Sequence, residues 1–318
     1  MALLTVLLLV AVMAAIAALV LDDVRFSVRR ATNADAGAQA QWYGLGAEAL
    51  ARRSVARLNA ADPARTRILP AWNGRAVAFP VEGGGIQMVL TDGQACFNLN
   101  SVVEGAGEFL VRRPAGVEQF IVLARAAGLA EAKARQIADG LTDWMDADTA
   151  ARPQGAEDAA YVAVGPGYRT GGVLLSEVSE LRAIRGVDPD SYARLRPYVC
   201  ALPTPDLSAL NVNTLTPDQS LLLLVLTNGK LSRSAARALI ADRPAEGWAT
   251  ADAFWSQPQL TRLSLVDRAT SQAEVRTRYF NLRADIDYGG ARMVRSALLE
   301  VLPDGRVRTV ARRWGPEE

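Results

Sequence analysis

The chain of 318 residues is long enough for one large domain, or for two modest ones beside a membrane anchor. Its formal net charge of +1 gives no reason to expect an electrostatic partner such as nucleic acid, and the sequence contains no histidine. The missing histidine excludes Ser-His-Asp and Cys-His catalysis and the usual zinc and haem ligand sets, and it is the strongest argument against an enzyme.

The N-terminal segment predicts one long helix whose first part lies in a membrane. The first 21 residues carry no charged side chain, and no turn residue follows until Asn33. At about 1.5 Å per residue this run spans a hydrocarbon core of about 30 Å, and it shows no basic start or cleavage site of a secretory signal. Beyond the run, apolar residues recur mostly three or four apart, at Val24, Val28, Ala31, Trp42, Leu45, Leu50, Val55 and Leu58. We therefore predict a helix over residues 1–60, half in lipid and half on a globular domain, with an ordinary single-span anchor as the alternative.

The charges beside this span leave its orientation open. Arg25, Arg29 and Arg30 follow the span and no basic residue precedes it, which by charge bias would place the globular part inside the cell. The other possibility is that a basic leader once preceded Met1 and is absent from this chain.

Turn residues divide the rest of the chain into a strand-rich frame and a helical middle. Five strands are predicted where apolar runs end at Gly-rich or Pro-Asp-Gly turns, at 76–81, 86–91, 273–287, 291–302 and 306–314. Seven helices are predicted between them, at 117–127, 131–145, 177–185, 190–198, 219–226, 232–241 and 250–257. The predicted fold class is α+β: a small domain formed by 61–103 and 266–318, split by an all-α insertion over 104–265.

The two cysteines, Cys96 and Cys200, are far apart in sequence and form no CxxC metal or redox pair. With no histidine to activate a thiol, a disulfide in an oxidising compartment is favoured over two buried free thiols. Such a bridge closes about 100 residues, could stabilise the fold by roughly 4 to 5 kcal/mol, and would clamp the insertion to the domain that carries Cys96.

The acidic stretch between Asp143 and Asp158 is the best candidate for chemistry. Hard cations such as Ca²⁺ need several carboxylate and carbonyl oxygens on a loop that can wrap around the ion. Asp146, Asp148 and Glu157 fall at positions 1, 3 and 12 of an EF-hand-like count, but alanines at positions 5 and 6 show that this is no EF-hand. Mg²⁺ fits less well because it usually keeps its waters. The alternative is that these carboxylates cap helix ends and face solvent.

Motifs in a fixed order over nearly the whole chain resemble the minor pseudopilin K family of type II secretion, general secretion pathway protein K. They are Ala2-Leu3-Leu4-Thr5-Val6-Leu7-Leu8-Leu9-Val10, Cys96-Phe97-Asn98-Leu99-Asn100, Asp143-Trp144-Met145-Asp146-Ala147-Asp148, Gly155-Ala156-Glu157-Asp158 with Tyr161, Val178-Ser179-Glu180-Leu181-Arg182, and Leu210-Asn211-Val212-Asn213-Thr214. Each motif alone is weak, and their order along the chain makes the resemblance specific.

The resemblance implies a pilin-like α+β domain with an inserted α-domain, at the tip of the periplasmic pseudopilus in a complex with minor pseudopilins I and J. It also implies contacts with other pseudopilins and secretion machinery, an inner-membrane anchor at residues 1–21, a periplasmic globular part, and no nucleic acid. Carried over onto this sequence, the calcium ligands would be Asp146, Asp148, Glu157 and Asp158, with Asp143 as a possible extra. Family members are cut from a basic leader, so Met1 would be the first mature residue, which would resolve the orientation.

The fifth residue, Thr5, departs from the usual pilin pattern of a glutamate there. A buried carboxylate at this position can neutralise the amino terminus of a neighbouring subunit, and it is costly to leave unpaired in lipid. A subunit at the tip lacks one neighbour, so Thr5 suits a cap better than a repeating subunit.

Two other functional classes share features with this sequence. Leu210-Asn211-Val212-Asn213-Thr214 with Ala241-Asp242-Arg243 is similar to a helix-hairpin-helix module of membrane-anchored DNA receptors, which bind phosphates through hairpin amides. Here the hairpin at 226–231 has one glycine, and residues 203–257 carry little excess positive charge, so we interpret it as a retained fold element. An anchored hydrolase has only Asp146, Glu157 and Asp158 in its favour.

Overall fold

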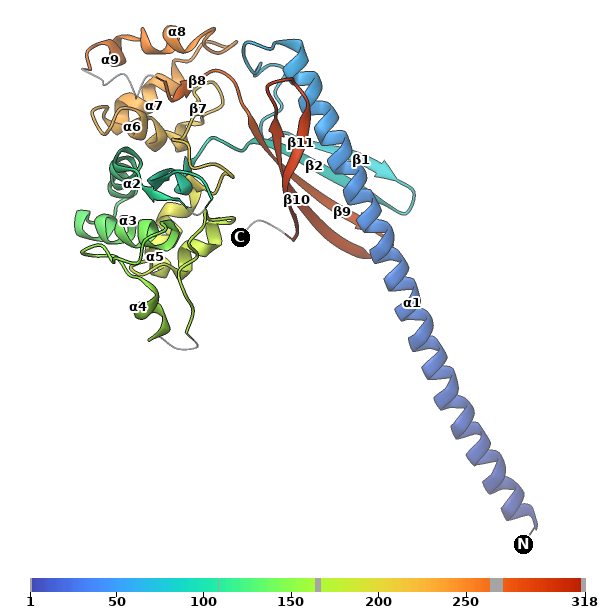
Figure 1. Cartoon of the computed structure of the whole chain (residues 1–318). Coiled ribbons are helices and arrows are strands. Elements are labelled where there is room, and N and C mark those ends of the chain that lie inside the picture. Colours follow the sequence, from blue (N-terminus) through green and yellow to red (C-terminus); the bar gives the residue numbers. More distant parts are fainter. Residues whose placement is uncertain (1, 108, 164–166, 264–270, 316–318) are drawn as a thin grey trace.

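The first helix, α1 (Ala2–Ala61), is continuous over 60 residues and projects far beyond the rest of the molecule (Figure 1). The computed structural model describes residues 2–107, 109–163, 167–263 and 271–315. Within this part, α1 is the one helix long and apolar enough to cross a membrane, and no residue of its apolar stretch is buried. Burial begins only at Ala36. The predicted long helix, half free and half packed on a domain, is confirmed.

The face of α1 that packs on the domain matches the apolar face expected from the spacing only at its C-terminal end. Small residues, Ala40, Gly44, Ala47 and Ala51, are buried against the sheet, whereas Trp42 is 68% exposed. A Cβ atom at Gly44 would lie 3.0 Å from the ring of Trp314, so the close approach of helix and sheet requires small side chains. Trp42, Leu45 and Leu50 therefore point away from the domain, whereas Val55 is buried and Leu58 packs against the same core.

The sheet has five strands in the order β1-β2-β9-β10-β11, and all neighbours are antiparallel. They are β1 (Ala76–Val81), β2 (Gly84–Asp92), β9 (Tyr279–Tyr288), β10 (Ala291–Val301) and β11 (Val307–Trp314). β2 pairs with β9 so that Ile86 lies opposite Ile286, and alternate residues of these strands form a core with α1. All three pairs of strands that were predicted to be joined by short turns are present and antiparallel, and the first pair turns at Gly83, whose φ of 83° favours glycine.

A buried ion network fastens α1 to the last two strands. Glu48 of α1 accepts hydrogen bonds from Arg295 Nη2 at 2.5 Å, Arg312 Nη2 at 2.8 Å and Thr309 Oγ1 at 2.6 Å. Glu48 and Arg295 are both 2% exposed, and the Arg295 guanidinium lies 4.4 Å from the centre of the Trp314 ring. Burial alone would raise the pKa of Glu48, but the bonds from Arg312, Thr309 and Arg295 outweigh it and lower the pKa to about 2.

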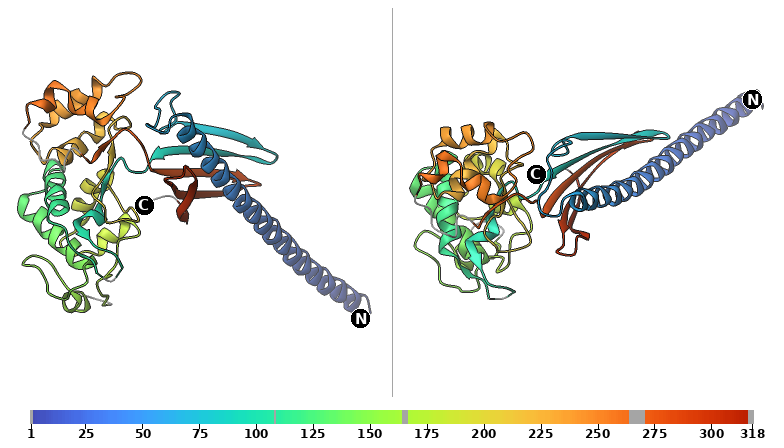
Figure 2. Two further views of the ribbon diagram at one scale, coloured as in Figure 1. Left: turned by 45° about the horizontal axis from the view of Figure 1, so that its top comes forward. Right: turned by 90° about the horizontal axis from the view of Figure 1, so that it is seen from above.

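The segment between β2 and β9 forms a separate, mainly helical body beside the sheet (Figures 1 and 2). Its helices are α2 (Pro114–Ala126), α3 (Glu131–Met145), α4 (Asp158–Val162), α5 (Pro189–Leu195), α6 (Leu221–Leu226), α7 (Arg233–Ala241), α8 (Ala251–Trp255) and α9 (Pro258–Thr261). Short 3₁₀ helices are η1 (Leu99–Val102), η2 (Val178–Ala183), η3 (Arg196–Tyr198) and η4 (Pro217–Gln219). This body has its own apolar core, centred on residues such as Phe97, Phe120, Leu141 and Leu226.

The insertion also contains two-residue strands that the sequence did not predict. These are the parallel pairs β3 (Phe97–Asn98) with β6 (Val199–Cys200) and β7 (Leu210–Asn211) with β8 (Ala273–Glu274), and the antiparallel pair β4 (Val103–Glu104) with β5 (Val111–Arg112). The strand expected over 273–287 is thus divided, because its first two residues pair inside the insertion. The end of the helical span, from 264 to 265, lies outside the described residues.

Polar side chains and the disulfide join the insertion to the sheet where the chain crosses between them. The buried carboxylate of Asp92 accepts hydrogen bonds from the hydroxyls of Thr214 at 2.6 Å and Thr277 at 2.8 Å, and burial raises its pKa to about 6. The predicted disulfide between Cys96 and Cys200 is present. It ties the segment that leaves the sheet after β2 to β6 of the insertion.

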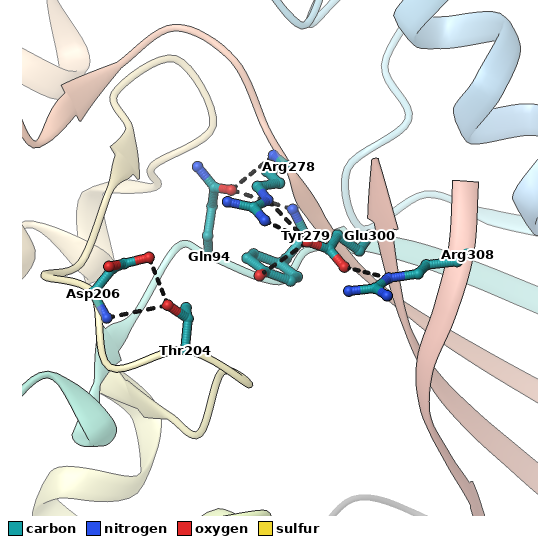
Figure 3. A network of polar contacts seen from close by, with 7 residues as sticks. All are labelled: Gln94, Thr204, Asp206, Arg278, Tyr279, Glu300 and Arg308. Carbon is teal, nitrogen blue, oxygen red and sulfur yellow. Dashed lines mark hydrogen bonds and ion pairs between the residues drawn. The ribbon is translucent and has the colours of Figure 1, made fainter. Parts of the chain in front are cut away.

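The segment that returns from β8 of the insertion to β9 of the sheet is held by a second polar network, drawn in Figure 3. The amide oxygen of Gln94 accepts bonds from the backbone N–H groups of Arg278 at 2.7 Å and Tyr279 at 3.2 Å. The guanidinium of Arg278 in turn donates to the buried Glu300 at 2.6 Å, which also accepts from Arg308 at 2.7 Å. The returning segment is therefore anchored by Gln94, which follows β2, and by Glu300 of β10.

Candidate metal centre

Three acidic side chains meet where α3 ends and α4 begins. Asp143 lies in the last turn of α3, Asp146 is the C-cap residue that follows this helix, and Glu157 is the N-cap residue that precedes α4. The amphipathic α3 buries Trp144 and Met145 beside them, which pulls the helix end into the core. Carboxylates at a helix C-terminus repel its negative dipole end, so this placement is unfavourable without a cation.

The three carboxylates share one small volume inside the insertion. One oxygen from each of Asp143, Asp146 and Glu157 lies within 4.8 Å of the other two. Their residues are 1%, 4% and 9% exposed. Among the described residues, Asp143 Oδ1, Asp146 Oδ1 and Glu157 Oε1 have no hydrogen-bond partner. Burying carboxylate oxygens without a partner costs folding free energy, so a ligand bound to these atoms would stabilise the protein.

Burial and mutual repulsion raise the pKa of all three groups. Burial is the main cause for each; it raises the pKa of Asp143 to about 6 and that of Glu157 to about 7. The neighbouring carboxylates add repulsion, and the pKa of Asp146 moves in the same direction. A bound cation would favour the charged forms and reverse these shifts.

The loop between the helices wraps closely around the two aspartates. The amide of Arg152 donates to Asp143 Oδ2 at 3.0 Å, and its guanidinium donates to Asp146 Oδ2 at 3.1 Å. A Cβ atom at Gly155 would lie only 1.9 Å from Asp143 Oδ2, so only glycine fits there. Sequence reasoning used neither Arg152 nor Gly155 as a site residue, although the Pro- and Gly-containing loop pointed to this segment.

The structure assembles some of the expected ligands and directs others elsewhere. Asp146 and Glu157 lie in the cluster, and Asp143, suggested only as an extra, is its most buried member. The carboxylate of Asp148 accepts a bond from the amide of Ala150 at 2.8 Å. That of Asp158 accepts two from Thr170, at 2.9 and 2.8 Å. Glu157 has an extended backbone and Asp158 is the first helical residue, and the two carboxylates have different surroundings.

An aromatic cluster lies beside the carboxylates. The ring centres of Trp144, Tyr161 and Tyr168 are 5.2 to 5.9 Å apart. Trp144 stands between Asp143 and Asp146 in sequence and is 8% exposed. Trp144 is therefore a fluorophore close to the acidic group.

The donor set fits a hard divalent cation. All three side chains offer oxygen alone, which suits Ca²⁺ and Mg²⁺ and not the softer metals that prefer sulfur or imidazole. Ca²⁺ takes six to eight oxygens in flexible geometry, and three carboxylates could supply several of them. The unpartnered oxygens described above are those that such an ion would satisfy.

Comparison with known proteins places the chain among relatives with the same overall extent. Residues 95–204 and 210–276 match two family models, both described as type II secretion system (T2SS), protein K. Type II secretion system protein K of Klebsiella pneumoniae is 37% identical over 316 residues, which cover 99% of this chain and 95% of the relative. That of Pectobacterium carotovorum subsp. carotovorum is 34% identical with the same coverage. The chain belongs to the type II secretion system protein K family.

A solved structure of the protein K family shares the fold. The crystal structure of the GspK-GspI-GspJ complex from the enterotoxigenic Escherichia coli type 2 secretion system contains a chain that is 29% identical, with a TM-score of 0.78. The match covers 90% of this chain and 99% of the other. The two protein K family models together run from Ala95 to Arg276, so they cover the insertion and stop where the sheet resumes.

Proposed function

We propose that this chain is a minor pseudopilin that caps the tip of the periplasmic pseudopilus in type II secretion, in a complex with minor pseudopilins I and J. The observation that carries the proposal is the match, over almost the whole fold, to a chain of the GspK-GspI-GspJ complex. The role is structural, and no catalytic step is assigned to it.

The shape of α1 supports a subunit that packs beside partner helices. Residues 2–35 are exposed, and the apolar face continues on the packed half of the helix through Trp42, Leu45 and Leu50, which are 68%, 41% and 37% exposed. An exposed apolar stripe of this length needs lipid or other helices to cover it. Partner helices would cover the part above the membrane.

Two features favour the tip over the shaft. The insertion lies beside the sheet and is the bulkier of the two bodies, which would obstruct stacking of identical subunits along a thin fibre (Figure 2). The hydroxyl of Thr5 donates to the carbonyl of Ala2 at 2.8 Å within the same helix. Thr5 thus needs no amino terminus of a neighbouring subunit as a partner.

The proposed location is the inner membrane, with residues 1–21 as anchor and the globular part in the periplasm. A disulfide suits that oxidising compartment. We propose that Ca²⁺ binds to Asp143, Asp146 and Glu157, where it would join the end of α3 to the start of α4 and stabilise the insertion.

The DNA-receptor alternative has no support in the hairpin between α6 and α7. The amides of Asn228, Gly229 and Lys230 donate to backbone carbonyls at 3.1, 2.8 and 3.0 Å, and that of Leu231 donates to Thr227 Oγ1 at 3.3 Å. These amides are engaged inside the chain, so they are not free to bind phosphates.

Co-expression with minor pseudopilins I and J tests the proposal. The full-length chain, extracted in detergent, should purify in a complex with one copy of each partner. Leu45→Asp should disrupt this complex because it places a charge in the helix interface. The matched control Val77→Asp on β1, where Val77 is 45% exposed, should leave it intact. Self-polymers, or tight binding to duplex DNA without the pseudopilins, would refute the cap.

A further inference from the structure

Arg152 makes an unusual set of contacts within the acidic cluster. Its backbone amide and its guanidinium engage one oxygen of each aspartate, the Oδ2 atoms of Asp143 and Asp146. Its Nε lies 3.6 Å from Asp143 Oδ1, too far for a hydrogen bond. The side chain is 24% exposed, whereas the two carboxylates it contacts are 1% and 2% exposed. Arg152 therefore covers the cluster from its solvent side.

This arrangement divides the oxygens of the aspartates between two tasks. The Oδ2 atoms are held by the loop, while Asp143 Oδ1, Asp146 Oδ1 and Glu157 Oε1 remain without hydrogen bonds among the described residues. Holding one oxygen of a carboxylate fixes the direction of the other. The loop thus orients the aspartates before any ion arrives, which lowers the entropy cost of binding.

Arg152 also changes the net charge of the acidic cluster. Three ionised carboxylates carry a charge of about −3, and the guanidinium reduces it to about −2, since arginine stays protonated. A divalent cation would neutralise this set, whereas a trivalent cation would leave it positive. Coulomb energies scale with the product of the charges, so the repulsion from Arg152 falls more heavily on a trivalent ion.

We propose that Arg152 is the positioning and charge-setting residue of the cation site: it holds the aspartates in place and matches the site to divalent rather than trivalent ions. This inference rests on the cation site proposed above. Arg152 acts through the carboxylates and is not itself a ligand.

The test compares Ca²⁺ with Tb³⁺ on the full-length chain in detergent. Calorimetry gives the dissociation constant of each ion, and Tb³⁺ luminescence excited through Trp144 reports occupancy independently. In Arg152→Gln the preference for Tb³⁺ over Ca²⁺ should rise by about tenfold or more, because the removed repulsion was larger for the trivalent ion. Arg135→Gln is the matched control: Arg135 also lies on the surface beside a carboxylate, Glu131, and should keep the wild-type ratio.

Arg152→Lys separates charge from shape. It keeps the charge and loses the planar fork, so its ion ratio should stay that of the wild type while its melting temperature in chelator falls. An unchanged ratio in Arg152→Gln would overturn the proposal. If that variant does not fold, a shifted ratio in Arg152→Lys overturns it and an unchanged one supports it. Absence of calcium heat in the wild type would instead refute the cation site itself.

Discussion

Replacing Glu48 by Gln should detach α1 from the last two strands. The variant removes the negative charge of Glu48 that Arg295 contacts in its buried position. It also replaces an oxygen that accepts bonds from Arg312 and Thr309 with a donor. The pKa of Glu48 in the folded protein is about 2, which is about 2.5 below the ordinary value of 4.5. One pKa unit corresponds to about 1.4 kcal/mol, so the ionised Glu48 stabilises the folded state by about 3 kcal/mol. Breaking a buried ion pair on one side costs a similar amount, about 3 to 5 kcal/mol.

Hydrogen exchange of the detergent-solubilised chain measures this loss locally. Amides of β10 and β11 should exchange faster by on the order of a hundredfold at pH 7, if they open through separation of the helix from the sheet. The stabilisation is complete above pH 4.5 and is lost as the pH falls towards 2, since protonation removes the charge that the folded state favours. The difference between wild type and variant should therefore shrink in acid.

The control is Glu82→Gln, at an exposed carboxylate in the first hairpin turn of the same domain. It should change exchange little, because surface charges contribute little. Equal exchange rates in Glu48→Gln and wild type at pH 7, or a difference that persists unchanged at pH 2, would refute the argument.

Three further predictions concern the insertion. Millimolar Ca²⁺ should raise the melting temperature if the site is micromolar, and Asp143→Ala with Asp146→Ala should abolish that rise, as scanning calorimetry would show. Gly155→Ala should also weaken calcium binding, because its Cβ would collide with Asp143 Oδ2. Mass spectrometry after alkylation without reduction should find neither Cys96 nor Cys200 modified, and replacing both by Ser should cost roughly 4 to 5 kcal/mol.

Controls and contradicting outcomes can be named for the calcium, Gly155 and disulfide predictions. Asp190→Ala, at a carboxylate paired with Arg194 on the surface, should leave the calcium effect intact, and a rise that survives in the double aspartate variant would relocate the site. A Gly155→Ala protein with native calcium affinity would show that the loop can move aside. Two alkylated thiols in the native protein would contradict the disulfide.

Local signals predicted the elements that are long or bounded by turn residues. α3 occupies 131–145 as expected, because its apolar spacing is regular over four turns. The hairpin strands follow from Gly83 and from Pro303-Asp304-Gly305. The 3₁₀ helices and two-residue strands are too short for any periodicity to show. The pairing of β2 with β9 across the insertion depends on tertiary contacts that no local pattern contains.

The site was predicted in part for similar reasons. Clustered carboxylates and a Pro- and Gly-containing loop indicated the segment, and the structure brings Asp146 and Glu157 of the four predicted ligands together; calcium binding there stays a prediction. The exchange of Asp158 for Asp143 depends on where α4 begins, and helix boundaries are the least predictable feature of a sequence. The role of Arg152 depends on a side-chain direction, which spacing does not reveal.

The interrupted sheet also gives the chain an order of assembly in time. β2 emerges before the insertion and gains its neighbour β9 only after the insertion is complete, so the first hairpin waits with an open edge and little stability of its own. The core of the insertion lies between Ala95 and Ala273, so this body can fold first. Glu48 receives Arg295 and Arg312 only from the last strands to be made. A chain that stops before β10 would therefore carry a folded insertion on a frame that cannot hold α1, so the packing of α1 depends on the last part of the chain to be made.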